Sequence, residues 1–282
     1  MKTLNRKLEE ELHQNIVSIV SLGGGCIGNA NKVTVKDGTN YFVKQYLNSK
    51  IHFAEANGLN ELKRTNTIRI PEVIKVNKDF LILEFIESAS KSKNFSNKFG
   101  RQFAEMHKTH NPKFGYVEDN FIGSTTQKNL PESDSWTDFY FQNRILFQYK
   151  LVEKNGYANS ELKSGISYLG QNIDKILNGS EEPPTLLHGD LWGGNYITDE
   201  QGNPCLIDPA VYFGHREADL AMTKLFGGFD SVFYQAYNEA YPLKDGWKYR
   251  ENIYKLYHIL NHLNLFGSGY LSQALSLINS YR

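Results

Sequence analysis

The chain has 282 residues, of which 40% are hydrophobic and 13% aromatic, so it can bury a substantial core and does not have the composition of a disordered protein. Lysine and arginine together number 31, as do aspartate and glutamate. This balance argues against a nucleic-acid-binding module or a polybasic membrane-binding protein, because both need excess positive charge. The length favours one globular unit with two lobes.

The first 87 residues are predicted to be rich in strands. An apolar residue recurs at every fourth position from Leu4 to Val20, which predicts an amphipathic helix over the first twenty residues. A glycine-rich stretch at 23–28 ends it. The turn Asp37-Gly38 predicts a β-hairpin. The strands expected in this part are 32–36, 41–44, 73–76 and 80–86, and a helix is expected over 51–64.

Beyond Glu87 the pattern becomes mostly helical. The polar residues 88–97 indicate a surface linker. Helices are predicted over 97–110, 135–154, 159–177, 216–226, 229–240 and 247–278, and short strands over 185–188, 196–198 and 205–207. We therefore predict an α+β, bilobal, protein-kinase-like fold with a strand-rich N-lobe (1–87), which would clamp the nucleotide, and a helical C-lobe (88–282), which would carry the catalytic loop, the metal site and the substrate pocket.

Three polar residues at the ends of short strands form the candidate catalytic set. Asp190 and Asn195 are five positions apart, and the predicted hairpin after them returns Asp208 to the side of Asn195. A carboxylate and an amide oxygen suit Mg²⁺, which prefers oxygen ligands. Asp190 is then left to accept or orient a hydroxyl proton. Either aspartate alone would more often be a turn residue, but the Asp-x-x-x-x-Asn spacing matches the known kinase pattern.

The N-lobe contains a candidate ATP clamp. Lys44 ends a strand where kinases place the lysine that pairs with the α- and β-phosphates, and Glu55, with Glu61 as the alternative, is its expected partner. Backbone N–H groups of a glycine-rich turn can approach phosphates, although such a turn is as often a bare loop. The glycines concerned are Gly23, Gly24, Gly25 and Gly28. The backbone groups that would bind adenine are those of Glu84, Phe85 and Ile86, which a plain core strand explains equally well.

The C-lobe pattern indicates a small substrate. Asp208 is followed almost at once by a predicted helix, which leaves no room for a peptide-docking activation segment. Trp192 is a candidate to stack on a sugar face, with core packing as the equal alternative. His215 and Asp219 are expected to brace the catalytic loop, and His215 is also a candidate substrate contact.

The two cysteines indicate a reducing compartment. They are too few for a disulfide framework, the N-terminus has no signal-peptide pattern, and no segment approaches the roughly 18 apolar residues of a membrane span. We therefore expect a cytoplasmic protein. Cys26, in the glycine-rich loop, is either a reactive thiol whose oxidation or intermolecular disulfide would block ATP, or an inert residue filling the turn. Cys205 is expected in the core, and both a monomer and a redox-linked dimer remain open.

The motif His188-Gly189-Asp190-Leu191-Trp192-Gly193-Gly194-Asn195, together with residues 208–222, strongly resembles the fructosamine kinase (ketosamine-3-kinase) family of aminoglycoside phosphotransferase-like kinases. The resemblance runs nearly the whole chain. It includes the segments 24–27, 42–44, 114–127 and 261–267.

The resemblance implies ATP-dependent phosphorylation of the third-carbon hydroxyl of a ketoamine, which is a sugar adduct on a protein lysine or a free amine. The 3-phosphate then destabilises the adduct and frees the amine. By the family pattern, Asp190 is the base, Asn195 and Asp208 hold Mg²⁺, and Lys44 and residues 84–86 hold ATP. Ribulosamine or erythrulosamine is expected in preference to fructosamine.

Two other functions share these residues. A kinase acting on an aminoglycoside, choline or a sugar would differ only in its C-lobe pocket. A catalytically inactive nucleotide-binding regulator is the alternative from another class, and the intact set of Lys44, Asp190, Asn195 and Asp208 argues against it.

Overall fold

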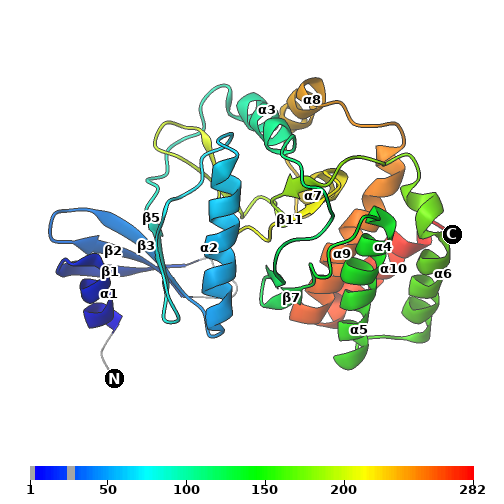
Figure 1. Ribbon diagram of the computed structural model, residues 1–282, viewed down its shortest axis with the longest axis horizontal. Coiled ribbons are helices and arrows are strands. Elements are labelled where there is room, and N and C mark those ends of the chain that lie inside the picture. Colours follow the sequence, from blue (N-terminus) through cyan, green and yellow to red (C-terminus); the bar gives the residue numbers. More distant parts are fainter. Residues whose placement is uncertain (1–3, 24–28) are drawn as a thin grey trace.

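The computed structural model describes residues 4–23 and 29–282. Its N-terminal part contains a five-stranded antiparallel sheet in the order β1-β2-β3-β5-β4, with α2 lying between this sheet and the helical part of the chain (Figure 1). The elements are α1 (Leu4–Leu12), β1 (Ile16–Leu22), β2 (Asn29–Val35), β3 (Asn40–Gln45), α2 (Ser49–Arg64), β4 (Val73–Val76) and β5 (Leu81–Glu84). The predicted hairpin, the helix over 51–64 and the two later strands are confirmed.

The prediction of one helix over the first twenty residues is wrong beyond Leu12, where α1 ends. The chain turns at His13, whose φ is 53°, and the following residues form β1, in which the N–H of Ile16 donates to Glu9 Oε1 at 3.0 Å. β-branched residues dominate β1, and they favour a strand. Its pairing with β2 also satisfies backbone groups that a helix would have bonded internally. The apolar residues spaced four apart therefore belong to two different elements, the helix α1 and the strand β1.

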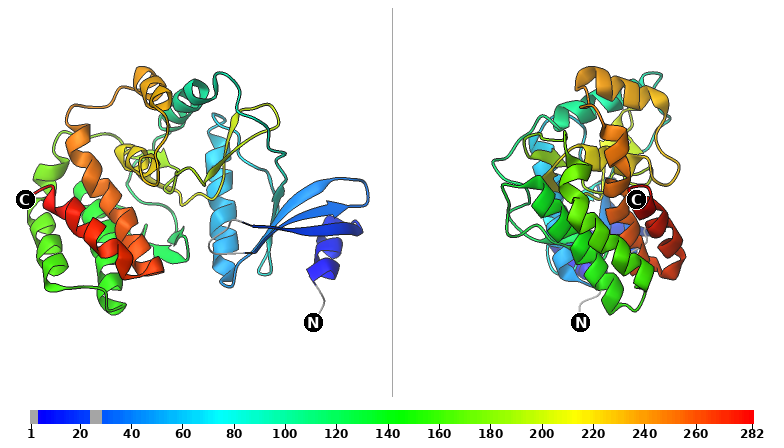
Figure 2. Two further views of the ribbon diagram at one scale, coloured as in Figure 1. Left: turned by 180° about the vertical axis from the view of Figure 1, so that it is seen from behind. Right: turned by 90° about the vertical axis from the view of Figure 1, so that its right-hand side faces the viewer.

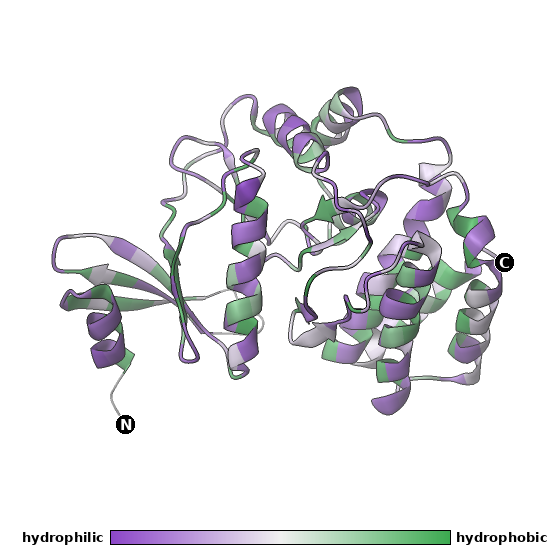
Figure 3. Ribbon diagram, in the orientation of Figure 1, coloured by the Kyte–Doolittle hydropathy of each residue, from purple (hydrophilic) through white to green (hydrophobic). Residues whose placement is uncertain are grey.

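The rest of the chain is mostly helical and shares one large apolar core. α3 packs against α8, and α9 packs against α7 and α10. The helices are α3 (Phe95–Met106), α4 (Trp136–Tyr140), the π-helix η1 (Phe141–Leu146), α5 (Phe147–Lys154), α6 (Ser160–Leu177), α7 (Glu217–Thr223), α8 (Ser231–Ala240), α9 (Trp247–Phe266), the short 3₁₀ helix η2 (Ser268–Tyr270) and α10 (Leu271–Asn279). Several of them show one polar and one apolar face (Figure 3).

The single helix expected over 247–278 is divided in the structure. α9 ends at Phe266, and Gly267 adopts a φ of 90°, a left-handed value that glycine reaches without strain. The chain then passes through η2 into α10, which packs back on α9. Among the helices of the described residues, none is long and apolar enough to cross a membrane.

Three two-stranded sheets lie in the helical part, and they position the candidate site. They pair β8 (Thr185–Leu187) with β11 (Tyr212–Gly214), β9 (Tyr196–Thr198) with β10 (Pro204–Leu206), and β6 (Asn120–Ile122) with β7 (Thr125–Gln127). The predicted strands β8, β9 and β10 are confirmed. β6, β7 and β11 were not among the predicted strands. The β9–β10 hairpin lies near one end of α2 in both opposed views (Figures 1 and 2).

Candidate functional site

A buried carboxylate on α7 fixes the start of the loop between β8 and β9. Asp219 Oδ2 accepts the N–H of His188 at 2.7 Å, and its Oδ1 accepts the N–H of Gly189 at 2.8 Å. His107, at the end of α3, lies 3.2 Å from Asp219 Oδ2 through Nε2. Asp219 is 1% exposed. The bracing role expected for this residue thus corresponds to hydrogen bonds with the two residues that precede Asp190.

The segment after β10 lies directly against this loop. Ala210 donates its N–H to the carbonyl of His188 at 2.8 Å, and His188 Nε2 donates to the carbonyl of Ile207 at 3.0 Å. Gly189 has a φ of 82°, and a Cβ there would lie 2.0 Å from the Ala210 carbonyl oxygen. Only glycine fits this close approach. Asp208 is therefore held beside the loop that carries Asp190.

Asp190 and Asn195 are joined directly. Asn195 Nδ2 donates to the main-chain oxygen of Asp190 at 2.7 Å and to its Oδ2 at 3.0 Å. The N–H of Ile207 donates to the Asn195 carbonyl at 3.1 Å, which links the loop to the return strand. Burial raises the pKa of Asp190 well above its ordinary value. A carboxylate with a raised pKa is a stronger proton acceptor once it is ionised.

Lys44, at the end of β3, contacts two carboxylates. Its Nζ lies 2.8 Å from Glu55 Oε1 on α2 and also contacts Asp208 Oδ1 from the C-terminal part. Glu55 additionally accepts the hydroxyl of Tyr46 at 2.6 Å. The alternative partner, Glu61, instead pairs with Arg64. Both Lys44 and Glu55 are buried. The two residues predicted to clamp ATP therefore lie next to Asp208, one of the candidate catalytic set.

The charges of this cluster stabilise one another. Burial alone would lower the pKa of Lys44, but the charges of Asp208 and Glu55 outweigh it and raise that pKa well above the ordinary value. Burial raises the pKa of Glu55 despite the attraction of Lys44. The lysine is therefore cationic at neutral pH, which a phosphate-binding group requires.

The chemistry of the donor set fits a hard divalent cation. Asn195 points its Nδ2 at Asp190, and no hydrogen bond within residues 4–23 and 29–282 uses its Oδ1. Asp208 contacts Lys44 through Oδ1, and its side chain is 41% exposed. One amide oxygen and one carboxylate oxygen are thus available, and phosphate oxygens and water would complete the coordination of Mg²⁺. No cluster of three or more His, Cys, Asp or Glu suited to a metal occurs in the described part of the chain.

Arg69 connects the N-terminal sheet to the β9–β10 hairpin, and the sequence offered no signal for it. Its guanidinium lies 2.6 Å from Glu84 Oε1 and 2.5 Å from Glu200 Oε1. Its carbonyl accepts the N–H of Leu206 at 3.0 Å. The end of β5 is thereby tied to the strand that leads to Asp208.

The predicted adenine-binding segment is only partly open in the structure. The N–H of Glu84 donates to the carbonyl of Glu72 at 2.8 Å, and its side chain holds Arg69, so that N–H is not free for a base. That backbone groups of Glu84, Phe85 and Ile86 bind adenine stays a prediction. Phe85 and Ile86 lie beyond the end of β5, and they remain the better candidates.

The β6–β7 hairpin holds the segment that follows Asp208. Gln127 Nε2 donates to the carbonyl of Ala210 at 2.8 Å, and Asn120 Nδ2 donates to the carbonyl of Val211 at 2.7 Å. Tyr257, on α9, donates its hydroxyl to Gln127 Oε1 at 2.8 Å. Asn120 and Gln127 belong to the mid-chain motif noted in the sequence, but the motif alone did not indicate what they contact.

The two candidate substrate residues differ in how far they are buried. Trp192 is half-buried and lies edge-on to Phe226, with ring centroids 5.9 Å apart. His215 is 3% exposed and packs between Trp136 and Phe114 at centroid distances of 4.7 and 5.3 Å. Burial lowers the pKa of His215 to about 3, so the ring is neutral. The prediction that His215 contacts the substrate is therefore wrong, because its ring is buried in the core and does not face solvent.

Some predicted residues lie outside the described part of the chain. These are Gly24, Gly25, Cys26 and Gly28, so the phosphate-loop and thiol hypotheses stay predictions; Gly23 is described. Cys205 is fully buried, and burial raises the pKa of its thiol to about 12, as expected of a core cysteine.

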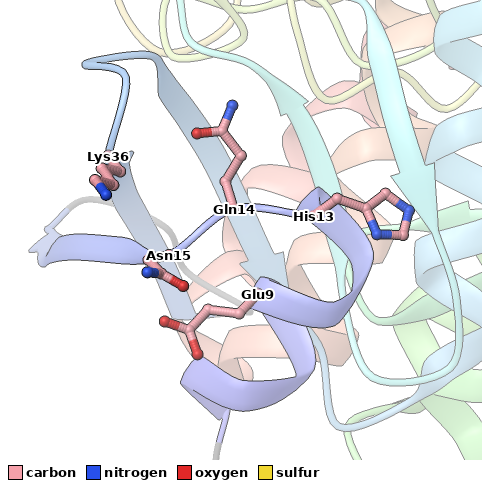
Figure 4. A pocket seen from close by; sticks show the side chains of 5 residues that line it. All are labelled: Glu9, His13, Gln14, Asn15 and Lys36. Atoms are coloured by element: carbon pink, nitrogen blue, oxygen red, sulfur yellow. The ribbon is translucent and has the colours of Figure 1, made fainter.

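A shallow polar hollow on the N-terminal part is lined by Glu9, His13, Gln14, Asn15 and Lys36 (Figure 4). Two of its side chains make hydrogen bonds within the N-terminal part. Glu9 accepts the N–H of Ile16, and Gln14 Nε2 donates to Asp37 Oδ2 at 2.6 Å. These bonds fix the connection from α1 to β1, and the hollow includes none of the candidate catalytic residues.

Replacing Asp219 by asparagine is expected to make the free energy of unfolding depend less on pH in the acidic range. Burial alone would raise the pKa of Asp219, but the hydrogen bonds from His107 and the Gly189 N–H outweigh it and hold the pKa below its ordinary value. A depressed pKa in the folded state stabilises the fold above the unfolded-state value near 4, and this stabilisation is lost as the pH falls further. Urea unfolding between pH 7 and pH 3 measures it.

The wild-type free energy of unfolding should fall more steeply below about pH 4 than that of Asp219→Asn. The variant should also be less stable at pH 7, since an amide cannot accept both loop N–H groups and the His107 hydrogen bond. Parallel pH profiles would show that Asp219 does not supply this stabilisation. Asp174→Asn, on α6 and away from the loop, is the matched control.

Comparisons with known proteins agree with the sequence motifs. The family model described as fructosamine kinase matches residues 1–282. A protein-ribulosamine 3-kinase, chloroplastic, from Oryza sativa subsp. japonica is 39% identical over 97% of this chain and 81% of its own length. A protein named "Probable ketoamine kinase" from Vibrio parahaemolyticus is 39% identical over 99% of this chain and 98% of its own length.

Solved structures show the same architecture. The crystal structure of a "putative fructosamine-3-kinase" from Thermobifida fusca superposes with a TM-score of 0.89 at 29% identity, and the match covers 99% of this chain and 98% of that one. A thermostable mutant of an aminoglycoside phosphotransferase superposes with a TM-score of 0.63 at 13% identity over 99% of each chain, a likeness of fold alone. The chain therefore has the α+β, protein-kinase-like fold, with a strand-rich N-lobe and a helical C-lobe.

Proposed function

Since this chain belongs to the fructosamine kinase family, we propose that it is an ATP-dependent kinase that phosphorylates the 3-hydroxyl of a ketoamine. The observation that carries the proposal is the meeting of Lys44, paired with Glu55, and the loop of Asp190, Asn195 and Asp208 at one place between the lobes. A phosphoryl transferase needs both parts, because its catalysis consists mainly of positioning and charge stabilisation.

The N-lobe, residues 1–87, would hold the nucleotide. Lys44 would exchange its contact with Asp208 for the α- and β-phosphates of ATP, while Glu55 keeps the lysine in place. Backbone groups of Phe85 and Ile86 would bind adenine. The glycines at 23–28 would cover the phosphates, and oxidation of Cys26 within that loop would then interfere with ATP.

The C-lobe, residues 88–282, would hold the metal and the substrate. Asn195 Oδ1 and Asp208 would bind Mg²⁺, which when bound neutralises phosphate charge. Asp190 would accept a hydrogen bond from the 3-hydroxyl, orient its oxygen toward the γ-phosphorus and take its proton as the new O–P bond forms. Trp192, two residues further along, would pack against the sugar.

The substrate would be a ribulosamine or an erythrulosamine in preference to a fructosamine. The support is that the plant relatives at 39% identity are named protein-ribulosamine 3-kinases. Phosphorylation at C3 would make the adduct unstable and return the free amine, so the enzyme would serve protein deglycation. We place it in the cytoplasm, where ATP, Mg²⁺ and reduced thiols are available.

A substrate panel tests this function. ATP consumption is measured with the ribulosyl, erythrulosyl and fructosyl adducts of Nα-acetyl-lysine, and with kanamycin and choline. The expected result is turnover of the ribulosyl and erythrulosyl adducts with a 3-phosphate product by NMR. Turnover of kanamycin or choline alone would support the other small-molecule kinase, and ATP binding without turnover of any compound would support the inactive regulator.

A further inference from the structure

Five rings form a continuous strip that starts on the catalytic loop and runs onto the C-terminal helices. We call it the aromatic strip: Trp192, Phe226, His262, Phe266 and Tyr270. Trp192 contacts Phe226 at 5.9 Å between centroids, and Phe226 contacts His262 at 4.8 Å. His262 then contacts Phe266 at 5.4 Å and Tyr270 at 5.2 Å. The strip thus joins three segments of the C-lobe: the loop between β8 and β9, the loop after α7, and the end of α9 with η2.

Much of the strip faces solvent. Phe226 is 45% exposed and Phe266 is 52% exposed. Trp192, His262 and Tyr270 are half-buried. Large apolar side chains left in water cost free energy, and contiguous ones mark binding surfaces more often than scattered ones do. The exposed rings therefore need an explanation beyond core packing.

The backbone conformation at Phe226 also indicates a binding surface. Phe226 has a φ of 55°, and Gly227 and Gly228 follow with φ values of 101° and 71°. A phenylalanine rarely adopts a left-handed conformation, and such strain persists where the surrounding structure imposes it, often at ligand sites. Here the strained turn presents an exposed ring beside Trp192.

The strip suits a cationic alkyl chain. His262 Nδ1 donates to the carbonyl of His258 at 2.8 Å, and burial lowers the pKa of His262, so its ring is neutral at pH 7 and does not repel a cation. Aromatic faces attract ammonium groups, and they also pack against methylene chains. The lysine of a ketoamine has both features: its nitrogen is a secondary ammonium bonded to C1 of the sugar, and its methylene chain extends from that nitrogen.

The substrate geometry places such a chain here. In a ketoamine the nitrogen is attached to C1, two carbons from the C3 that carries the reacting hydroxyl. With that hydroxyl at Asp190, the amine and its substituent must leave the site close to the loop that bears Trp192. The aromatic strip begins at Trp192 and is open to solvent, as a chain anchored to a protein surface requires.

We propose that the aromatic strip binds the alkylammonium chain of the lysine that carries the ketoamine, and so selects lysine adducts over adducts of small amines. This proposal rests on the proposed function, since it places the reacting hydroxyl at Asp190. The discriminating rings are Phe226 and Phe266, which lie outside the catalytic set.

The test compares two substrates with the same sugar: the ribulosyl adduct of Nα-acetyl-lysine amide and the ribulosyl adduct of methylamine. Both adducts carry the same secondary ammonium at C1, and only the lysine adduct adds a methylene chain. The wild type is therefore expected to show a kcat/KM about tenfold higher for the lysine adduct, through packing of that chain on the rings. Phe226→Ala and Phe266→Ala should each reduce this ratio about threefold to fivefold, through KM of the lysine adduct. The kcat and the KM of ATP should stay unchanged.

Tyr249→Ala is the matched control, because Tyr249 is a 54% exposed aromatic residue on the same helix, α9, whose ring contacts Tyr281 and not the strip. Its ratio should equal that of the wild type. Thermal unfolding of all variants shows that they fold. An unchanged ratio in both phenylalanine variants would overturn the strip proposal alone. No turnover of either adduct by the wild type would overturn the proposed function and the strip proposal together.

Discussion

Asp190→Asn is expected to lower kcat by roughly 10²- to 10⁴-fold while leaving ATP affinity within about twofold of the wild type. The amide has the same shape as the carboxylate but cannot take the hydroxyl proton. The hydrogen bond from Asn195 to the main-chain oxygen of Asp190, at 2.7 Å, does not depend on the side chain, so the loop should keep its conformation. Steady-state kinetics with a ribulosyl-lysine substrate and calorimetric titration with ATP measure the two effects.

The exposed Asp134 supplies a matched control. Asp134 lies in the loop before α4, and its side chain is 81% exposed and pairs with Lys113 at 3.5 Å. Asp134→Asn makes the same chemical change at an exposed position outside the candidate catalytic set and should retain full turnover. If Asp190→Asn kept a kcat within threefold of the wild type, Asp190 would not be the base, and another acceptor would have to take the proton.

Lys44→Met is expected to impair both stability and activity. The substitution leaves Glu55 buried without its cation, and removing one partner of a buried ion pair costs about 3–5 kcal/mol. The pKa of Glu55 is already raised by burial, so in the variant this carboxyl should be protonated over a wider pH range. ATP affinity and kcat should fall together, because the phosphates lose their lysine. Urea unfolding and kinetics measure the two effects separately.

The double variant Lys44→Met/Glu55→Gln separates the structural effect from the catalytic one. A neutral glutamine needs no buried cation and can still bond the Tyr46 hydroxyl, which lies 2.6 Å from Glu55 Oε2. Most of the lost unfolding free energy should therefore return while activity stays low. Equal unfolding free energies for the wild type and Lys44→Met would show that the pair contributes no stability. Recovered activity in the double variant would exclude Lys44 as a phosphate-binding residue.

Local signals predicted the elements that depend on near neighbours. The Asp37-Gly38 turn defines the β2–β3 hairpin, since glycine at position 38 reaches a φ of 90° without strain. The helices α2 and α6 begin at asparagine side chains that accept backbone N–H groups, which are Asn48 and Asn159. These elements are encoded within a few residues, so a sequence pattern is enough to locate them.

Elements that depend on a distant partner were missed or wrong. Residues 16–22 have the spacing of a helix, yet they form β1 because β2 offers backbone partners. The strands β6, β7 and β11 were not predicted, and each is defined by its pairing with another strand. Gly267 ends α9 where the sequence pattern continues, because the chain folds back so that α10 packs on α9.

The sequence alone determined the chemistry of this protein. The spacing of Asp190, Asn195 and Asp208 and the motif around Trp192 point to a phosphotransferase of the fructosamine kinase family, and the family model matches residues 1–282. The tertiary structure decided what each residue contacts. Lys44 reaches Asp208 across 164 positions, and the strip from Trp192 to Tyr270 unites three separate segments. Such contacts arise from the packing of whole lobes and helices, which no local pattern specifies.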